Sequence, residues 1–223
     1  MRRVVFMMIL ALVMLARAKA QESSLPVKEW DAANDNPFVL YVSGDGGINN
    51  FSKDLCNAIN KAGYCIAAVN AKSYFWDKKT PEQATSDLIS YLRKRFQNRR
   101  NQELVLAGYS FGADVLPFIV RLLSEDIKSK LVSVLLVSPS TSTDFQVHLA
   151  DMLGGNTKRS MDVVAELNRM ESPQTITVFG SDENEFPVQL IHLKNYHNEV
   201  LPGGHRYFNK TDDLAKIMVS YFK

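Results

Sequence analysis

The apolar residues of this chain occur in two patterns that alternate along its length. Short, nearly continuous apolar runs are typical of strands buried on both faces of a sheet, whereas apolar residues that repeat every three or four positions are typical of helices. The expected strands are FVLYV at residues 38–42, YCIAAVNA, ELVLAG, LVSVLLVSP, TITVFG and a last strand edge at NEVLPGG.

Helix signals fall between these runs. Residues 51–62 carry apolar side chains at helical spacing, and Gly63 supplies a C-terminal stop. The Thr80–Gln83 stretch combines a capping residue, a proline at the first helical position and a glutamine at the third, so we expect a helix from there to about Phe96. Further helices are expected at residues 111–124, near 161–170 and at 211–222.

Strands that alternate with helices predict an α/β fold, with a mostly parallel sheet covered by helices on both faces. The 223 residues suit one sizeable core, and we find no repeat or internal boundary. We therefore expect a single domain over residues 37–223, preceded by a polar N-terminal segment at residues 21–36.

The first 20 residues have the three-part build of a secretory signal peptide. Arg2 and Arg3 give a basic start, residues 4–15 form an apolar run, and Ala18 and Ala20 supply small residues for cleavage. The rival interpretation is a membrane anchor, but this run is shorter than the roughly 20 residues that a spanning helix needs. The leader predicts export.

The net charge limits the classes of binding partner that are expected, and the two cysteines raise the question of a disulfide. Removal of the leader leaves 22 basic and 24 acidic residues, so the net charge falls from +2 to −2 and a nucleic-acid partner is not expected. The basic residues between 93 and 100 suit a solvated helix end, with contact to anionic lipid as the alternative. Cys56 and Cys65 could form a disulfide in an exported chain or be buried and free.

The stretch Gly108-Tyr109-Ser110-Phe111-Gly112 stands where a strand should turn into a helix. This is the setting of a nucleophile elbow, in which the serine hydroxyl is exposed at the turn. The alternative is that Ser110 is only a turn residue between two glycines. Serine chemistry also needs a base, an acid that orients the base, and donors for the oxyanion.

An acid and a histidine follow Ser110 in the required chain order. SDENEFP, after the strand TITVFG, offers Glu183 as the preferred acid, three residues after Gly180, with Asp182 as the runner-up. LPGGHRYF, after the last strand edge, offers His205 as the base. The other histidines, His148, His192 and His197, lack such placement.

The oxyanion donors should be backbone N–H groups. The N–H of Phe111 follows the nucleophile, and the glycine-rich loop SGDGG should supply the second donor from Asp45, with Gly46 next. The loop lacks the lysine and hydroxyl residue of a phosphate-binding loop. No cluster has metal-ligand spacing, so neither a metal nor a cofactor is expected.

Residues 140–160 mix polar, glycine and apolar positions after a strand. In this architecture such an insertion commonly covers the site above the strand ends, so it is a candidate lid, with a plain surface loop as the alternative.

With these residues in view, the chain resembles the α/β-hydrolases, and more narrowly the bacterial virulence protein family VirJ, whose domain also forms the C-terminal part of AcvB. The similar stretches are YVSGDGG, SYFWDKKTPEQATSDL, LAGYSFGADVLPF, VFGSDENEFP and LPGGH, which together cover most of residues 38–208. The chain departs from the family pattern at Ile48, where a tryptophan is expected after the glycines, and this difference bears on the shape of the substrate pocket.

The resemblance implies a periplasmic protein linked to virulence and type IV secretion. AcvB-like members resemble lipid hydrolases that remove lysine from lysyl-phosphatidylglycerol, which implies that Ser110 attacks an aminoacyl ester at the membrane surface. Such a substrate carries ammonium groups, so Asp114 or Asp45 is expected to bind one of them. The alternative for Asp114 is that it hydrogen-bonds nearby loop backbone and stabilises the elbow.

A second class of function stays open. The same fold could serve as a non-catalytic periplasmic accessory that binds secreted substrates or components of a secretion system. The sequence leaves the oligomeric state undetermined.

Overall fold

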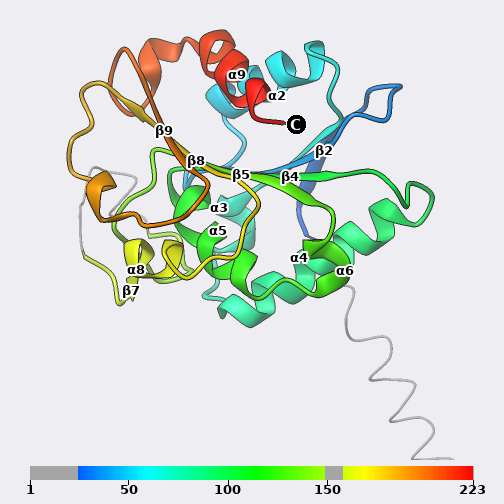
Figure 1. Ribbon diagram of the computed structural model, residues 1–223, viewed down its shortest axis with the longest axis horizontal. Helices are drawn as coiled ribbons and strands as arrows, with labels where there is room; N and C mark the ends of the chain where they lie inside the picture. The colour runs from blue at the N-terminus through cyan, green and yellow to red at the C-terminus, as the bar shows by residue number, and fades with distance from the viewer. Residues whose placement is uncertain (1–24, 149–157, 223) are drawn as a thin grey trace, which may run out of the picture.

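The computed structural model describes residues 25–148 and 158–222, and within them the backbone forms one seven-stranded sheet with the order β1-β3-β2-β4-β5-β8-β9 (Figure 1). Six strands are parallel and β1 runs antiparallel to β3 at one edge. The strands are β1 (Val27–Trp30), β2 (Phe38–Val42), β3 (Ile66–Val69), β4 (Leu104–Tyr109), β5 (Leu131–Val137), β8 (Thr175–Gly180) and β9 (Tyr196–Leu201).

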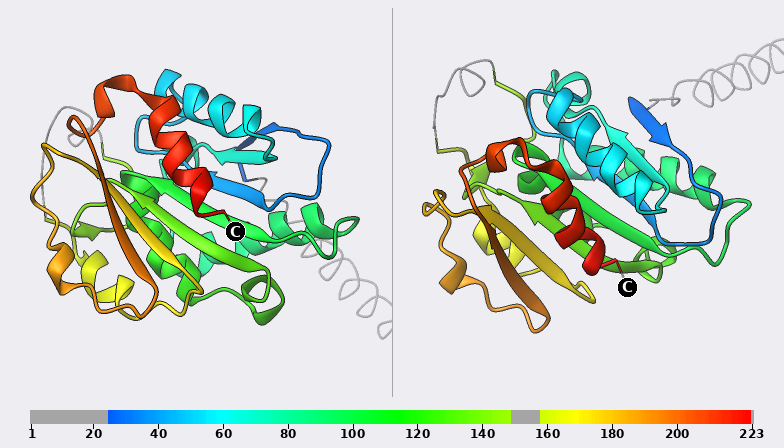
Figure 2. Two further views of the ribbon diagram at one scale, coloured as in Figure 1. Left: turned by 45° about the horizontal axis from the view of Figure 1, so that its top comes forward. Right: turned by 90° about the horizontal axis from the view of Figure 1, so that it is seen from above.

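Helices cover both faces of the sheet, so the α/β fold expected from the sequence is confirmed. One face carries α2 (Asn50–Lys61) and α9 (Thr211–Ser220), which lie side by side in Figures 1 and 2. The opposite face carries α3 (Ala71–Tyr74), α4 (Pro81–Phe96), α5 (Phe111–Arg121), α6 (Glu125–Lys128) and α8 (Val163–Leu167).

Successive side chains of a strand point to opposite faces, so each inner strand contributes to two apolar layers. In β2, Val39 and Tyr41 pack toward α2 and α9, whereas Phe38, Leu40 and Val42 pack toward α4 and α5. Every residue of β2, β4 and β8 is buried, which explains why these strands are continuous apolar runs in the sequence.

Local signals place the helix ends as the sequence predicts. The Thr80 side chain accepts from the Gln83 N–H, and the Gln83 side chain accepts from the Thr80 N–H, which forms a capping box at the start of α4. Gly63, just after α2, has φ of +94°, a conformation that favours glycine.

Two regions differ from the sequence prediction. Residues 21–36 contain β1, which pairs with β3 and extends the sheet. The helix expected near residues 161–170 is shorter, because Met161 pairs with Thr143 between β6 (Ser142–Thr143) and β7 (Met161–Asp162). Asp162 then caps the helix by accepting from the Ala165 N–H.

The two cysteines lie in different layers and are free. Cys56 belongs to α2 and is buried in the layer between this helix and the sheet, whereas Cys65 is buried on the opposite face and contacts the backbone of Ala32 through its sulfur. Of the two possibilities that the sequence leaves open, the structure therefore has buried, unbridged thiols.

The expected signal peptide, residues 1–20, lies outside the described residues, as do residues 149–157 of the candidate lid. The part of the lid segment that is described packs on the loop after α3, where Val147 donates to the Phe75 carbonyl oxygen at 2.9 Å. Within residues 25–148 and 158–222, no helix is long and apolar enough to cross a membrane.

Candidate active site

Ser110 occupies the turn between β4 and α5, with φ of +53° and ψ of −122°. A positive φ is uncommon for a residue with a side chain and persists only where the surroundings enforce it. Here the Ser110 N–H donates to the Val137 carbonyl oxygen at 2.8 Å, and the Ser110 carbonyl oxygen accepts from Ala113 at 2.7 Å. These bonds hold the hydroxyl at the carboxyl edge of the sheet.

The two glycines that flank Ser110 are required by close packing. A Cβ on Gly108 would lie 2.5 Å from the Gly112 carbonyl, and a Cβ on Gly112 would lie 2.1 Å from the Val42 carbonyl oxygen. The absence of side chains lets α5 begin directly against the ends of β2 and β4. The motif therefore has a structural cause that does not depend on its chemistry.

His205 lies between Ser110 and Glu183. Its Nε2 is 3.0 Å from Ser110 Oγ, and its Nδ1 is 2.7 Å from Glu183 Oε1. Both distances are within hydrogen-bond range. The structure thus brings together three of the residues that the sequence singles out, from the ends of β4, β8 and β9.

Glu183 has a second set of partners on its other carboxylate oxygen. Oε2 accepts from the Ser138 hydroxyl and from the Gly180 N–H, each at 2.7 Å. Burial alone raises the pKa of Glu183, but the hydrogen bonds from His205, Gly180 and Ser138 outweigh it and lower the pKa below its usual value. The carboxylate is therefore ionised at neutral pH.

The loop that carries His205 is fixed on both sides. Tyr109 donates its hydroxyl to the His205 carbonyl oxygen at 2.9 Å, and its ring lies 5.2 Å from the imidazole. On the other side, a Cβ on Gly180 would lie 2.3 Å from the Gly203 carbonyl oxygen, so the loop packs directly on the end of β8.

Asp182, the runner-up acid, points elsewhere. Its carboxylate accepts from the Ser181 hydroxyl at 3.1 Å, and its backbone N–H donates to the Gly203 carbonyl oxygen at 3.0 Å. The structure therefore places Glu183, rather than Asp182, against His205.

The residues expected to bind an oxyanion lie beside Ser110. A Cβ on Gly44 would be 3.4 Å from Ser110 Cβ, and the Gly47 N–H donates to the Gly44 carbonyl oxygen, which closes a turn that presents Asp45 and Gly46. Phe111 is the first residue of α5, so its N–H has no acceptor inside the helix.

Asp114 lies behind this surface. It is 6% exposed, and its two carboxylate oxygens accept from the N–H and the hydroxyl of Ser140, each at 2.6 Å. Burial raises the pKa of Asp114 to about 7, although the bonds from Ser140 oppose the shift. Of the two expected roles, this geometry matches the one in which Asp114 ties the elbow helix to a neighbouring loop.

A cavity of about 470 Å³ adjoins His205 and Glu183. Three carboxylates line it, Asp182, Glu183 and Glu185, together with the aromatic rings of Phe179 and Phe186. Ser140 and its neighbours after β5 form the other wall. Ser110 is not part of the lining. The cavity therefore lies beside Ser110, and His205 and Glu183 belong both to its wall and to the site.

The remaining histidines are placed apart from Ser110. His148 bonds Asp144 at 2.8 Å, His197 stacks near Tyr221, and His192 is exposed. Within the described residues, no group of three or more His, Cys, Asp and Glu side chains could hold a metal ion.

Ser138 and Tyr207 contact the site but were missed by the sequence reasoning. Ser138 directly follows the strand LVSVLLV and Tyr207 is two residues after His205, so a place at a strand end for Ser138 and closeness to His205 for Tyr207 are the signals that the sequence offers.

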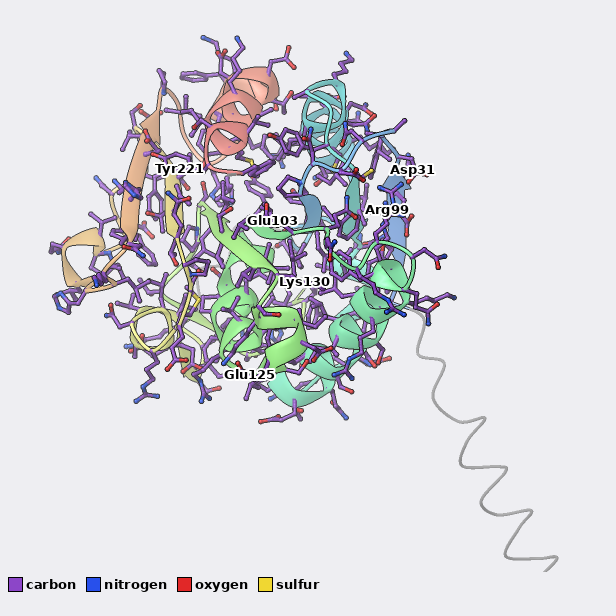
Figure 3. The ribbon with its side chains drawn as sticks, turned by 45° about the vertical axis from the view of Figure 1, so that its right-hand side comes forward. Asp31, Arg99, Glu103, Glu125, Lys130 and Tyr221 are labelled. Atoms are coloured by element: carbon purple, nitrogen blue, oxygen red, sulfur yellow. The ribbon has the colours of Figure 1, made fainter. Side chains whose placement is uncertain are left out.

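The basic segment at the end of α4 lies far from this site. Figure 3 labels Glu103 and Lys130, which precede β4 and β5 and so mark the amino-terminal edge of the sheet, with Arg99 at the same edge. Ser110 is at the carboxyl edge. Arg93 in this segment pairs with Asp126 at 2.9 Å.

The strand order and the elbow after β4 define an α/β-hydrolase fold. The chain belongs to the family described as bacterial virulence protein (VirJ), which matches residues 36–223. No curated protein matches the chain in sequence.

Solved structures with the same fold are distant in sequence. A proline iminopeptidase from Mycobacterium smegmatis has 12% identity and a TM-score of 0.63, over 88% of this chain and 93% of its own. MenH from S. aureus has 11% identity and a TM-score of 0.63, over 88% and 97%. A lipase-esterase related protein from Clostridium acetobutylicum has 14% identity and a TM-score of 0.59, over 87% and 99%.

Proposed function

We propose that this protein is a serine hydrolase that cleaves a carboxylic ester. The observation that carries the proposal is the continuous path from Ser110 Oγ to His205 Nε2 at 3.0 Å and from His205 Nδ1 to Glu183 at 2.7 Å. A serine beside a base that is itself oriented by an acid is the arrangement that nucleophilic acyl transfer needs.

Each group has a distinct role in this mechanism. His205 takes the proton of Ser110 as its hydroxyl oxygen attacks the ester carbonyl, and ionised Glu183 stabilises the imidazolium that forms. The N–H of Phe111 and an N–H from Asp45 or Gly46 stabilise the oxyanion. His205 then gives its proton to the leaving alcohol, which leaves the acyl group on Ser110. Water attacks this acyl-enzyme, His205 takes a proton from the water and returns it to Ser110 Oγ, and the acyl group leaves as the carboxylic acid.

The substrate that we propose is an aminoacylated phospholipid such as lysyl-phosphatidylglycerol. The family resemblance suggests it, and the cavity beside His205 supports it, because its lining carboxylates suit a group that bears ammonium charges. Asp45 is half-buried in the loop after β2 and is the second candidate for an ammonium contact. Asp114, engaged with Ser140, is less accessible to a ligand.

Two exposed aromatic residues support action at a membrane surface. Trp76 follows α3 and is 49% exposed, and Phe208 follows His205 and is 67% exposed. Both come after strands that end at the carboxyl edge, where Ser110 lies, and Lys72 and Lys78 accompany Trp76. Aromatic and basic side chains together suit an anionic lipid interface. A periplasmic location and a link to type IV secretion belong to the same proposal.

Labelling with a fluorophosphonate probe tests the enzymatic role. Wild type should label, and Ser110→Ala should not. Ser90→Ala, which removes an exposed hydroxyl on α4, is the matched control and should label like wild type. If wild type and Ser110→Ala label alike, or if neither labels while both are folded, the hydrolase proposal fails and a binding role in the periplasm takes its place.

Incubation with lysyl-phosphatidylglycerol vesicles tests the substrate. Mass spectrometry should find free lysine and phosphatidylglycerol with wild type and neither with Ser110→Ala. Probe labelling without lysine release would retain the hydrolase and reject this substrate.

A further inference from the structure

A chain of buried hydroxyl groups reaches Glu183 from the side opposite His205. Ser138 Oγ lies 2.7 Å from Glu183 Oε2 and 2.5 Å from the Tyr207 hydroxyl, which also donates to the Val178 carbonyl oxygen at 2.9 Å. Ser138 is 3% exposed and Tyr207 is fully buried. Water therefore does not compete for these bonds, and each proton must go to a protein acceptor.

The proton count fixes the direction of the chain. An ionised carboxylate only accepts hydrogen bonds, so Ser138 gives its single proton to Glu183. The short contact between Ser138 and Tyr207 must then use the Tyr207 proton, which is shared with the Val178 carbonyl. Burial raises the pKa of Tyr207 far above its usual value, so the hydroxyl keeps this proton. The two hydroxyl groups therefore both donate in the direction of Glu183.

The backbone at both hydroxyl residues is held in an uncommon conformation. Ser138 has φ of +49° and Tyr207 has φ of +52°, and neither is a glycine. Such conformations cost on the order of 1 kcal/mol or more and persist where surrounding contacts enforce them. Ser138 is held by its N–H, which donates to the Val178 carbonyl oxygen at 2.8 Å, so Val178 anchors both members of the chain.

We infer that Ser138 and Tyr207 are positioning residues, which fix Glu183 Oε2 so that Oε1 faces Nδ1 of His205. The inference rests on the proposed hydrolase function, because holding Glu183 in place affects a reaction rate only if Glu183 is the acid of a catalytic site. Without the two hydroxyls, Glu183 keeps only the Gly180 N–H on Oε2, and its side chain gains freedom to turn away from His205.

The hydrogen bond between His205 and Glu183 provides a readout that a change in packing alone would not alter. Because ionised Glu183 only accepts hydrogen bonds, the Nδ1–H of His205 donates to Oε1, and loss of either hydroxyl that fixes Oε2 should weaken this bond.

Matched controls exist for both substitutions. Tyr207→Phe removes one buried hydroxyl, and Tyr41→Phe removes another from the same core layer, where Tyr41 contacts Ser52 rather than Glu183. Ser138→Ala is matched by Ser133→Ala on β5, the strand that leads to Ser138, because the buried Ser133 hydroxyl has no hydrogen-bond partner among the described residues. Tyr207→Phe also keeps the test valid if Ser138→Ala does not fold.

The experiment follows the His205 Nδ1–H resonance by NMR at one neutral pH and measures the rate of fluorophosphonate labelling. In Ser138→Ala and Tyr207→Phe this resonance should move upfield or be lost to exchange with solvent, and labelling should slow roughly tenfold, as expected for loss of a hydrogen bond to a charged group. The two controls should match wild type. If wild type labels and both variants keep its Nδ1–H resonance and labelling rate, this inference is overturned alone. If wild type does not label, the proposed function fails, and the catalytic effect assigned to Ser138 and Tyr207 fails with it.

Discussion

Ser140 donates two hydrogen bonds to Asp114, one from its N–H and one from its hydroxyl, and each is 2.6 Å long. This pair joins the first turn of the elbow helix to the loop after β5, which forms one wall of the cavity beside His205. These two hydrogen bonds couple the position of the helix that follows Ser110 to the shape of that cavity. Because Asp114 is buried, the same pair also makes stability depend on pH.

Stability should fall as the pH rises toward neutrality. The pKa of Asp114 is about 7 in the folded chain and near its ordinary value of 3.8 when unfolded. Between these values the folded state binds more protons, so the contribution of Asp114 to the free energy of unfolding is present below pH 3.8 and is lost as the pH rises to 7. The full loss is up to about 4 kcal/mol.

Asp114→Asn tests this relationship because an amide occupies the same space and does not titrate. Urea unfolding of wild type and Asp114→Asn at pH 5 and pH 8 should show the variant gaining stability relative to wild type at the higher pH. A difference between the two proteins that is the same at both values would contradict the prediction.

Replacement of the acids should separate Glu183 from Asp182. Glu183→Gln removes the charge that stabilises the imidazolium and should reduce the probe-labelling rate by about 10³-fold or more. Asp182→Asn changes a carboxylate that bonds Ser181, so its rate should stay within about threefold of wild type. Equal losses in the two variants would argue against the assignment of Glu183.

Gly112→Ala should destabilise the fold severely, because the added Cβ would lie 2.1 Å from the Val42 carbonyl oxygen. We expect a loss of roughly 3 kcal/mol or more in the free energy of unfolding, since the atoms that the new Cβ would meet are backbone atoms, which cannot move without disturbing β2. Thermal or urea unfolding measures the loss. A near-neutral result would show that α5 can move away from β2.

Trp76→Ala should weaken action at a membrane and leave a soluble ester unaffected. The expected result is reduced sedimentation with anionic phosphatidylglycerol vesicles, with an unchanged rate on a short-chain soluble ester. Leu190→Ala is a control of similar exposure, because Leu190 is 50% exposed and lies beside the end of α8. Equal effects of the two substitutions would reject a specific lipid contact at Trp76.

The sequence by itself determined the elements and the position of Ser110 at a turn. These features depend on short-range causes: the period of apolar residues, the caps at Thr80 and Gly63, and glycines that admit a close approach. The sequence also limited the acid to two neighbouring residues and named His205, because parallel strands bring their carboxyl ends to one edge.

Only the tertiary structure decided which side chains meet at that edge. Glu183 faces His205 while Asp182 turns to Ser181, and Asp114 is engaged by Ser140, 26 residues away. Cys56 and Cys65 lie on opposite faces of the sheet. β1 pairs with β3 and forms one edge of the sheet, although its own residues show no apolar pattern. Such outcomes depend on hydrogen bonds and packing between segments that are distant in the chain, and no local pattern of residues encodes them.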